Sequence, residues 1–229
     1  MYPIYDIEGI NSCEREIEEK HVIILLFVKP GDKNADEILN LVNYLHYKSD
    51  GYCAIYLIGY SQDFMNKYRD VKNIDGVDGE KWQYSDNCFI SVCKQLQTRL
   101  KNWKYSGEPE MILLQNTTER QTSDRLDFRG YNYIDINYGI KKGYIDSFAR
   151  FMERVIDACR EEVNATNAIK KANRSRINCR NVIEMAIEET PKLPNGIKKI
   201  LKDTVFYKSC RNNTDKEKNI FHSNPFGYR

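Results

Sequence analysis

The sequence predicts an α/β protein in which helices cover the faces of a sheet. Three short runs of apolar residues have the length and composition of buried strands, at 22–28, 52–60 and 111–115. The segments around them carry apolar residues every three or four positions, as on one face of a helix. Strands that alternate with helices in this way favour one main domain built around a single sheet.

The first predicted unit is strand, turn, helix, strand. Pro30 and Gly31 indicate a turn after 22–28, and Asn34 with Glu37 has the spacing of a capping box that begins a helix. The apolar face of this helix is Ile38, Leu41, Val42 and Leu45. We expect the strand at 52–60 to run parallel to 22–28 through a right-handed crossover.

Residues 61–84 show no sustained period and predict a long loop with at most one short helix. The loop is unusually aromatic, which indicates a partner-binding loop; the alternative is that the rings pack over the sheet. The aromatic residues are Tyr60, Phe64, Tyr68, Trp82 and Tyr84. Ser85 or Asp86 can then cap a helix. Its predicted apolar stripe is Phe89, Cys93, Leu96, Leu100 and Trp103.

The second half of the domain begins at Pro109, directly before the apolar run at 111–115. A polar loop over 116–130 follows. Residues 131–138 alternate apolar and polar side chains, which predicts a half-exposed or edge strand antiparallel to 111–115. A helix follows, with an apolar stripe at Ile145, Phe148, Met152, Val155 and Cys159.

Charge divides the chain near residue 162. Residues 1–162 carry a net charge of −6 and residues 163–229 one of +8. We therefore distinguish an α/β domain, 1–162, from a basic, mainly helical C-terminal segment, 163–229, in which 165–189 and 197–206 are expected to be helical and 209–229 a polar tail. The basic segment is predicted to dock on a partner or on nucleic acid; the alternatives are a solvated face or contact with the acidic domain. Its candidate residues are Lys170, Lys171, Arg174, Arg176, Arg180, Lys198, Lys199 and Lys202.

Redox, metal and cofactor chemistry find little support in the sequence. The seven cysteines include no Cys-x-x-Cys and have no histidine nearby to complete a zinc set, so we expect free thiols, no metal and no cofactor. Cys53, Cys93 and Cys159 fall on apolar faces and are expected in the core. Neither a dinucleotide-binding glycine motif nor a P-loop is present. The turn of Lys29 and Gly31 could still offer a lysine and backbone N–H groups to an anion.

An enzymatic role would have to use strand-end acids or a thiol. Glu108, Glu110 and Asp135 are the acids that the predicted strands would bring to their ends. Cys88 lies near a helix N-terminus, where the helix dipole lowers the pKa of a thiol, but no histidine is placed to assist it. A hydrolase or thiol enzyme of unknown substrate is therefore an alternative, and a non-catalytic role is favoured.

The compartment is inferred from what the chain lacks. The longest apolar run has seven residues, whereas a membrane span needs about twenty. The first eight residues have neither the positive nor the apolar region of a secretory signal. We expect a cytoplasmic protein with no membrane partner.

The order β-α-β-α-β-β-α over residues 21–162 resembles the thioredoxin-like fold, in which a proline corresponding to Pro109 usually follows a cis peptide bond. In redox-active members the turn after the first strand contains a cysteine, but 29–34 here has none. The resemblance therefore implies a mixed sheet in a redox-inactive binding module. A flavodoxin-like parallel sheet is the alternative, since the first units suit it equally.

Together these observations predict a non-catalytic intracellular binding or regulatory protein with a protein partner. Nucleic-acid binding through the basic segment is the first alternative, and an enzyme is the second.

Overall fold

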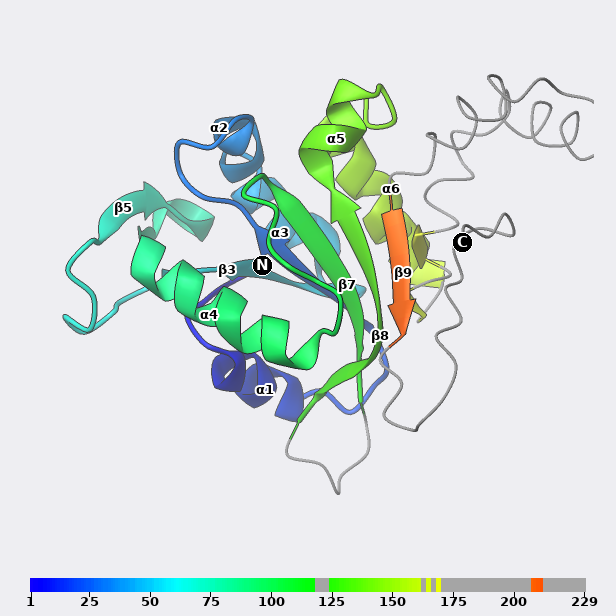
Figure 1. Cartoon of the computed structure of the whole chain (residues 1–229), viewed down its shortest axis with the longest axis horizontal. Coiled ribbons are helices and arrows are strands. Elements are labelled where there is room, and N and C mark those ends of the chain that lie inside the picture. The colour runs from blue at the N-terminus through cyan, green and yellow to red at the C-terminus, as the bar shows by residue number, and fades with distance from the viewer. Residues whose placement is uncertain (118–123, 162–163, 166–167, 170–206, 212–229) are drawn as a thin grey trace, which may run out of the picture.

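A computed structural model describes residues 1–117, 124–161, 164–165, 168–169 and 207–211. Within these residues the protein has an α/β fold with two sheets (Figure 1). The larger sheet has the strand order β1-β3-β2-β7-β8-β9 among the described residues. Its strands are β1 (Tyr2–Ile4), β2 (Val22–Phe27), β3 (Cys53–Ile58), β7 (Glu110–Asn116), β8 (Leu126–Asp135) and β9 (Tyr207–Arg211).

The large sheet is mixed. β1, β3 and β2 run parallel, whereas β7 is antiparallel to β2 and β8 is antiparallel to β7. The predicted parallel β-α-β unit and the predicted antiparallel pair are both confirmed. The all-parallel, flavodoxin-like alternative is wrong because β7, which follows α4 in the chain, pairs with β2 in the antiparallel direction.

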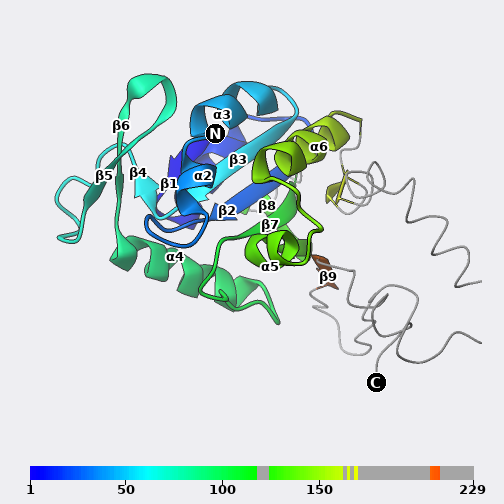
Figure 2. The ribbon, with the colours of Figure 1, turned by 90° about the horizontal axis from the view of Figure 1, so that it is seen from above.

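Two layers of helix cover the large sheet. α1 (Ile7–Arg15) packs beside α4 (Asp86–Arg99) on one face. α2 (Ala35–Leu39) and α3 (Val42–Ser49) pack beside α6 (Phe148–Glu161) on the other. Figure 2 shows α4 on one side of the strands and α3 with α6 on the opposite side. Every residue of β2 and β3 is therefore buried, as their continuous apolar sequences predict.

Most residues of the predicted helix stripes lie buried in helices, but Leu100, Trp103 and Ile145 are buried outside them. Phe148, Met152, Val155 and Cys159 of α6 are buried, and so are Phe89, Cys93 and Leu96 of α4. The predicted helix after the first turn is divided into α2 and α3. Asn34 does not cap it: its backbone is left-handed, with φ 64°, and its side chain donates instead to Asn137 Oδ1 at 2.8 Å.

Residues 61–84, predicted as one long loop, contain the strands of a second, antiparallel sheet, and only 62–71 form a long stretch without helix or strand. The order of this sheet is β4-β6-β5, from β4 (Tyr60–Ser61), β5 (Lys72–Asp75) and β6 (Lys81–Tyr84), with the 3-10 turn η1 (Val77–Gly79) joining β5 to β6. β4 has only two residues and β5 is almost wholly polar, so neither produces the alternation that predicts a strand. The tight approach of Gly76 to Trp82 leaves no room for a Cβ.

The N-terminal elements β1 and α1 were also not predicted, because β1 has three residues and α1 only nine. α1 begins at a capping residue, Asp6, whose Oδ1 accepts from the Gly9 N–H at 2.7 Å. The strand predicted at 131–138 lies instead at 126–135. It ends because Asp135 caps α5 (Ile136–Lys141), accepting from the Tyr138 N–H at 2.8 Å.

The C-terminal segment contributes to the large sheet. Residues 207–211 form β9, which pairs antiparallel with β8, with Asn132 opposite Ser209. The predicted polar tail over 209–229 is therefore wrong for its first three residues. Ala165, Ala168 and Ile169 are helical and buried. The remaining predictions for the segment, including all eight of its candidate basic residues, lie outside the described residues.

The cis peptide bond expected before Pro109, directly before β7, is not found among the described residues. No peptide bond among the described residues is cis, so the bond before Pro109 is trans. This differs from the expectation that the thioredoxin-like resemblance raised for Pro109.

Candidate functional site

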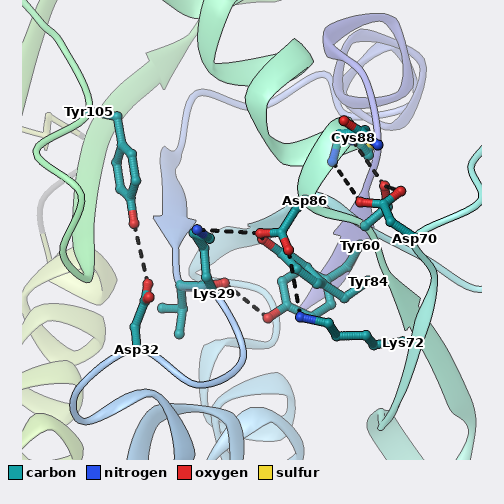
Figure 3. Close-up of polar contacts among 12 residues, drawn as sticks. Lys29, Asp32, Tyr60, Asp70, Lys72, Tyr84, Asp86, Cys88 and Tyr105 are labelled. Atoms are coloured by element: carbon teal, nitrogen blue, oxygen red, sulfur yellow. Dashed lines mark hydrogen bonds and ion pairs between the residues drawn. The ribbon is translucent and has the colours of Figure 1, made fainter.

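A polar cluster lies at the carboxyl end of β2, where the chain turns toward α2. The turn is closed by two backbone hydrogen bonds, from Asp32 N to Lys29 O at 3.1 Å and from Ala35 N to Asp32 O at 3.0 Å. Gly31 allows it, with φ 91°. Lys29 and Asp32 thereby lie near residues from the small sheet and from α4 (Figure 3).

Asp86, the first residue of α4, is the centre of the charged part of the cluster. Its carboxylate accepts from the Tyr84 hydroxyl at 2.9 Å and lies 3.3 Å from Lys29 Nζ and 3.6 Å from Lys72 Nζ. Burial alone would raise the pKa of Asp86, but the hydrogen bonds from Tyr84 and Lys29 lower it. Lys29 therefore has an anionic partner within the protein, which weakens the hypothesis that the turn binds an external anion.

Asp32 occupies the other side of the turn. The Tyr105 hydroxyl donates to its Oδ2 at 3.4 Å. Burial raises the pKa of Asp32, although the positive charge of Lys29 opposes that shift. Tyr105 lies between α4 and β7, and its ring packs edge-on against the buried Phe89 ring, with 5.0 Å between the ring centroids, which fixes the position of its hydroxyl.

The aromatic residues of the predicted partner-binding loop lie mainly inside the protein. Tyr60, Phe64, Trp82 and Tyr84 are buried and Tyr68 is partly buried. The Tyr60 and Tyr84 rings pack 4.9 Å apart, and the Tyr60 hydroxyl donates to the Val28 carbonyl at 2.9 Å. This placement agrees with the alternative that the rings pack over the sheet, so a partner would contact the polar surface of the segment rather than most of these rings.

Cys88 does not have the environment of a reactive thiol. It lies in the first turn of α4, where the Ser85 hydroxyl caps the helix by accepting from the Cys88 N–H at 3.1 Å. The thiol itself is buried and donates to the Tyr5 carbonyl at 3.4 Å. Burial raises the pKa of Cys88 to about 11, which corrects the expectation that the helix dipole lowers it.

The three strand-end acids lie near one end of β7, but each has a separate structural contact. Glu110 is fully buried, whereas Asp135 caps α5 and Glu108 accepts from the Asn137 side chain. Glu110 accepts from Trp103 Nε1 at 3.0 Å, from the Ser106 hydroxyl at 2.7 Å and from the Tyr133 hydroxyl at 3.1 Å. A general acid must reach its substrate, so a fully buried Glu110 is poorly placed for that role.

The thiols predicted for the core are found there. Cys53, Cys93 and Cys159 are buried and free. Cys93 lies in α4, and burial raises its pKa to about 12. The described residues contain no cluster of three His, Cys, Asp or Glu side chains arranged to hold a metal ion.

Sequence reasoning missed the parts of the cluster that come from the small sheet. Lys72 and the Tyr84–Asp86 hydrogen bond were not predicted because β5 and β6 were not recognised as strands. The signal was the Tyr84-Ser85-Asp86 run itself, in which a capping serine follows a β-prone residue. Chemically, the cluster contains positive and negative side chains and hydroxyl groups whose positions are fixed by hydrogen bonds, which suits recognition of a polar surface.

Comparisons with known proteins do not extend these observations. No protein-family model, no curated protein and no solved structure matches the chain. None of the helices in the described part of the chain has the length and apolar character that a membrane crossing requires.

Proposed function

We propose that this chain is a non-catalytic, intracellular binding or regulatory protein built on a thioredoxin-like layout without redox chemistry. The layout is supported by the five strands β1-β3-β2-β7-β8, in which β1, β3 and β2 are parallel, β7 is antiparallel to β2 and β8 is antiparallel to β7. The observation that carries the proposal is the turn after β2. Where redox members of that fold carry a thiol, this chain has Lys29 and Asp32, bonded to Asp86 and Tyr105.

The thiols support the same proposal. Disulfide exchange needs an accessible thiolate. Cys88 is the cysteine labelled in Figure 3, and it is buried with a raised pKa. Cys13, on α1, is exposed, and partial burial raises the pKa of its thiol.

A disulfide-reduction assay tests the redox-inactive part of the proposal. The full chain is mixed with dithiothreitol and a protein that contains a reducible disulfide, and an active thioredoxin serves as the positive control. We expect a rate equal to that of dithiothreitol alone. A rate above this background that disappears in Cys88→Ser would overturn the proposal.

A separate experiment tests binding. The full chain is cross-linked in cell extract, partners are identified, and each candidate is purified and titrated against the chain. We expect saturable binding to at least one purified protein. If no purified candidate binds and the chain sediments as a monomer at every concentration, the binding function is wrong.

Nucleic-acid binding is the second candidate because of the charge division in the sequence, −6 against +8. A chain cut at residue 162 would also lose β9, so substitutions in the full chain are the cleaner test. We would follow anisotropy of labelled DNA and RNA across a salt series, with the variant Arg174→Ser/Arg176→Ser/Arg180→Ser. The matched control is Lys20→Ser/Lys94→Ser/Lys104→Ser, which removes the same charge from exposed positions of the acidic domain.

If the basic segment binds nucleic acid, the arginine variant weakens binding and lowers the salt slope by about one for each phosphate that is no longer neutralised. Equal binding by both variants would exclude these arginines from the nucleic-acid interface.

A further inference from the structure

α3 and α6 lie side by side on one face of the large sheet (Figure 2). Two side-chain pairs join these helices along their exposed seam, and a third pair joins α6 to Tyr52, which follows α3. The Tyr44 hydroxyl donates to the Glu153 carboxylate. Lys48 Nζ lies 3.5 Å from Asp157 Oδ1. The third pair is Tyr52 and Arg160, described below. We call the surface formed by Tyr44, Tyr47, Tyr52, Glu153 and Asp157, together with Asp78 of η1 beside α3, the α3–α6 face.

The tyrosine rings of this face are exposed and oriented by hydrogen bonds. Tyr44 is 41% exposed and Tyr47 is 59% exposed. The Tyr47 hydroxyl donates to the Asp78 carboxylate at 2.6 Å, and Tyr44 is held by Glu153. A ring that is already oriented loses little conformational entropy when a partner covers it, and exposed tyrosines supply much of the binding energy at protein interfaces.

The charges around these rings are mainly negative. Asp157 remains 53% exposed although Lys48 lies close to it, and Glu153 is partly exposed. Lys48 and Arg160 both face Asp157, whereas neither Glu153 nor Asp78 forms an ion pair with any of the described residues.

Arg160 shows which group fits this surface. Its guanidinium lies 4.3 Å from the centroid of the Tyr52 ring and 3.9 Å from Asp157 Oδ1, so it stacks on a tyrosine and faces a carboxylate at the same time. Tyr44 with Glu153 and Tyr47 with Asp78 repeat the combination of ring and carboxylate. Among the described residues, no cation lies over the ring of Tyr44 or Tyr47.

We propose that the α3–α6 face docks an arginine-containing segment of a partner protein, whose guanidinium groups stack on Tyr44 and Tyr47 and pair with Glu153 and Asp78. Arginine is specified over lysine because its planar, weakly hydrated guanidinium can stack on a ring and bond a carboxylate together. The inference rests on the proposed binding function and names the surface and the chemistry of the partner.

The test is a fluorescence-anisotropy titration of the full chain with a short labelled peptide of arginine, glycine and serine. Two further peptides carry lysine or glutamate in place of arginine. We expect saturable binding of the arginine peptide, weaker binding of the lysine peptide and none of the glutamate peptide. Equal affinity for the arginine and lysine peptides would overturn the stacking arrangement, because a screened point charge would then explain the binding.

Variants locate the interface. Tyr47→Ala/Glu153→Gln removes one exposed ring and one partly exposed charge, and we expect the dissociation constant for the arginine peptide to rise about tenfold. The matched control, Asp75→Asn/Tyr5→Ala, removes one charge and one 41%-exposed ring from elsewhere on the surface and should change it less than about twofold. Circular dichroism and thermal unfolding confirm that both variants fold. Equal losses in the two variants would overturn the assignment of the face.

The chain's own basic segment is the competing occupant. If the wild-type chain does not bind the arginine peptide but the variant Arg174→Ser/Arg176→Ser/Arg180→Ser does, an internal segment covers the face and the proposal of a partner is wrong. If no variant binds the peptide while a purified partner still binds the Tyr47→Ala/Glu153→Gln variant, this inference fails and the proposed binding function stands.

Discussion

Glu14 and His21 form a buried ion pair between α1 and the start of β2. Glu14 Oε2 lies 2.9 Å from His21 Nε2, and the Tyr56 hydroxyl donates to Glu14 Oε1 at 2.6 Å. On its other side, His21 Nδ1 lies 3.0 Å from the Asn116 side-chain nitrogen. Burial acts to lower the pKa of His21, but the hydrogen bond to Glu14 and its charge raise it above 6.5 overall. Through these contacts the pair connects α1 and the residue before β2 to β3 and β7.

This pair predicts a pH dependence of stability. Since the folded pKa of His21 is above the unfolded value of 6.5, its contribution is complete below pH 6.5 and is lost as the pH rises through the folded pKa. His21→Leu leaves Glu14 buried without its cation and is expected to cost about 3 kcal/mol of unfolding free energy at about pH 6. Urea unfolding from about pH 5 to 8 measures this; an unchanged pH profile in His21→Leu would contradict it.

Glu110 is a second buried acid whose titration affects stability. Burial raises its pKa from 4.5 to about 7, while hydrogen bonds from Ser106, Tyr133 and Trp103 act in the opposite direction. The contribution of the neutral form is complete below pH 4.5 and is lost as the pH rises through about 7. Glu110→Gln should remove this dependence and still cost about 1–3 kcal/mol, because its amide N–H₂ faces donors.

The exposed neighbour Glu108 provides the matched control for that prediction. Glu108→Gln should change the free energy of unfolding by less than about 0.5 kcal/mol at either pH, as is usual for a surface position. Chemical denaturation of both variants at about pH 5 and about pH 8 separates the two residues. Equal effects would show that Glu110 does not titrate in the folded protein.

At the scale of the elements, the close packing of the small sheet on α4 depends on Gly59, between β3 and β4. Its φ is 88°, and a Cβ built on it would lie 2.7 Å from the Phe89 Cβ. Gly51, after α3, also has a positive φ, 73°, but a Cβ there would meet nothing within 4 Å. Gly51 is therefore required only for its backbone conformation, whereas Gly59 is required also because no side chain fits beside Phe89.

Substitution of these glycines tests that distinction. Gly51→Ala should destabilise the protein by about 1 kcal/mol through backbone strain alone. Gly59→Ala adds a clash with a buried ring and should cost more, on the order of 3 kcal/mol. Thermal and urea unfolding of the two variants give both values, and an equal loss would mean that the small sheet shifts away from α4 without cost.

At the scale of the whole molecule, the larger sheet is completed from two distant parts of the sequence. β8 lies within the acidic domain, whereas β9 comes from the basic segment, and their ladder runs from Gly130 opposite Arg211 to Ile134 opposite Tyr207. The boundary at residue 162 is therefore a boundary of charge, and the sheet continues across it.

Removal of β9 tests this organisation. A chain ending at residue 206 leaves the outer edge of β8 without its partner, so the amide hydrogens of 130–134 should exchange faster and the melting temperature should fall. A chain ending at residue 211 keeps β9 and serves as the control. Unchanged exchange at 130–134 in the shorter chain would contradict the pairing.

The sequence by itself determined the features that depend on local pattern. The continuous apolar runs identified β2, β3 and β7 because a strand buried on both faces needs no alternation, and the stripes of α4 and α6 identified their buried faces. The cysteines of those faces were placed in the core for the same reason. The lack of a thiol in the turn after β2 was also visible directly.

Only the tertiary structure decided the features that depend on distant partners. β4, β5 and β9 are short or polar and form strands because another strand satisfies their backbone groups. The Tyr84–Asp86–Lys29 contacts and the seam between α3 and α6 join residues from separate elements, and the burial of Cys88 outweighs the helix dipole. Local pattern carries no information about such neighbours, because folding brings together residues that are far apart in the sequence.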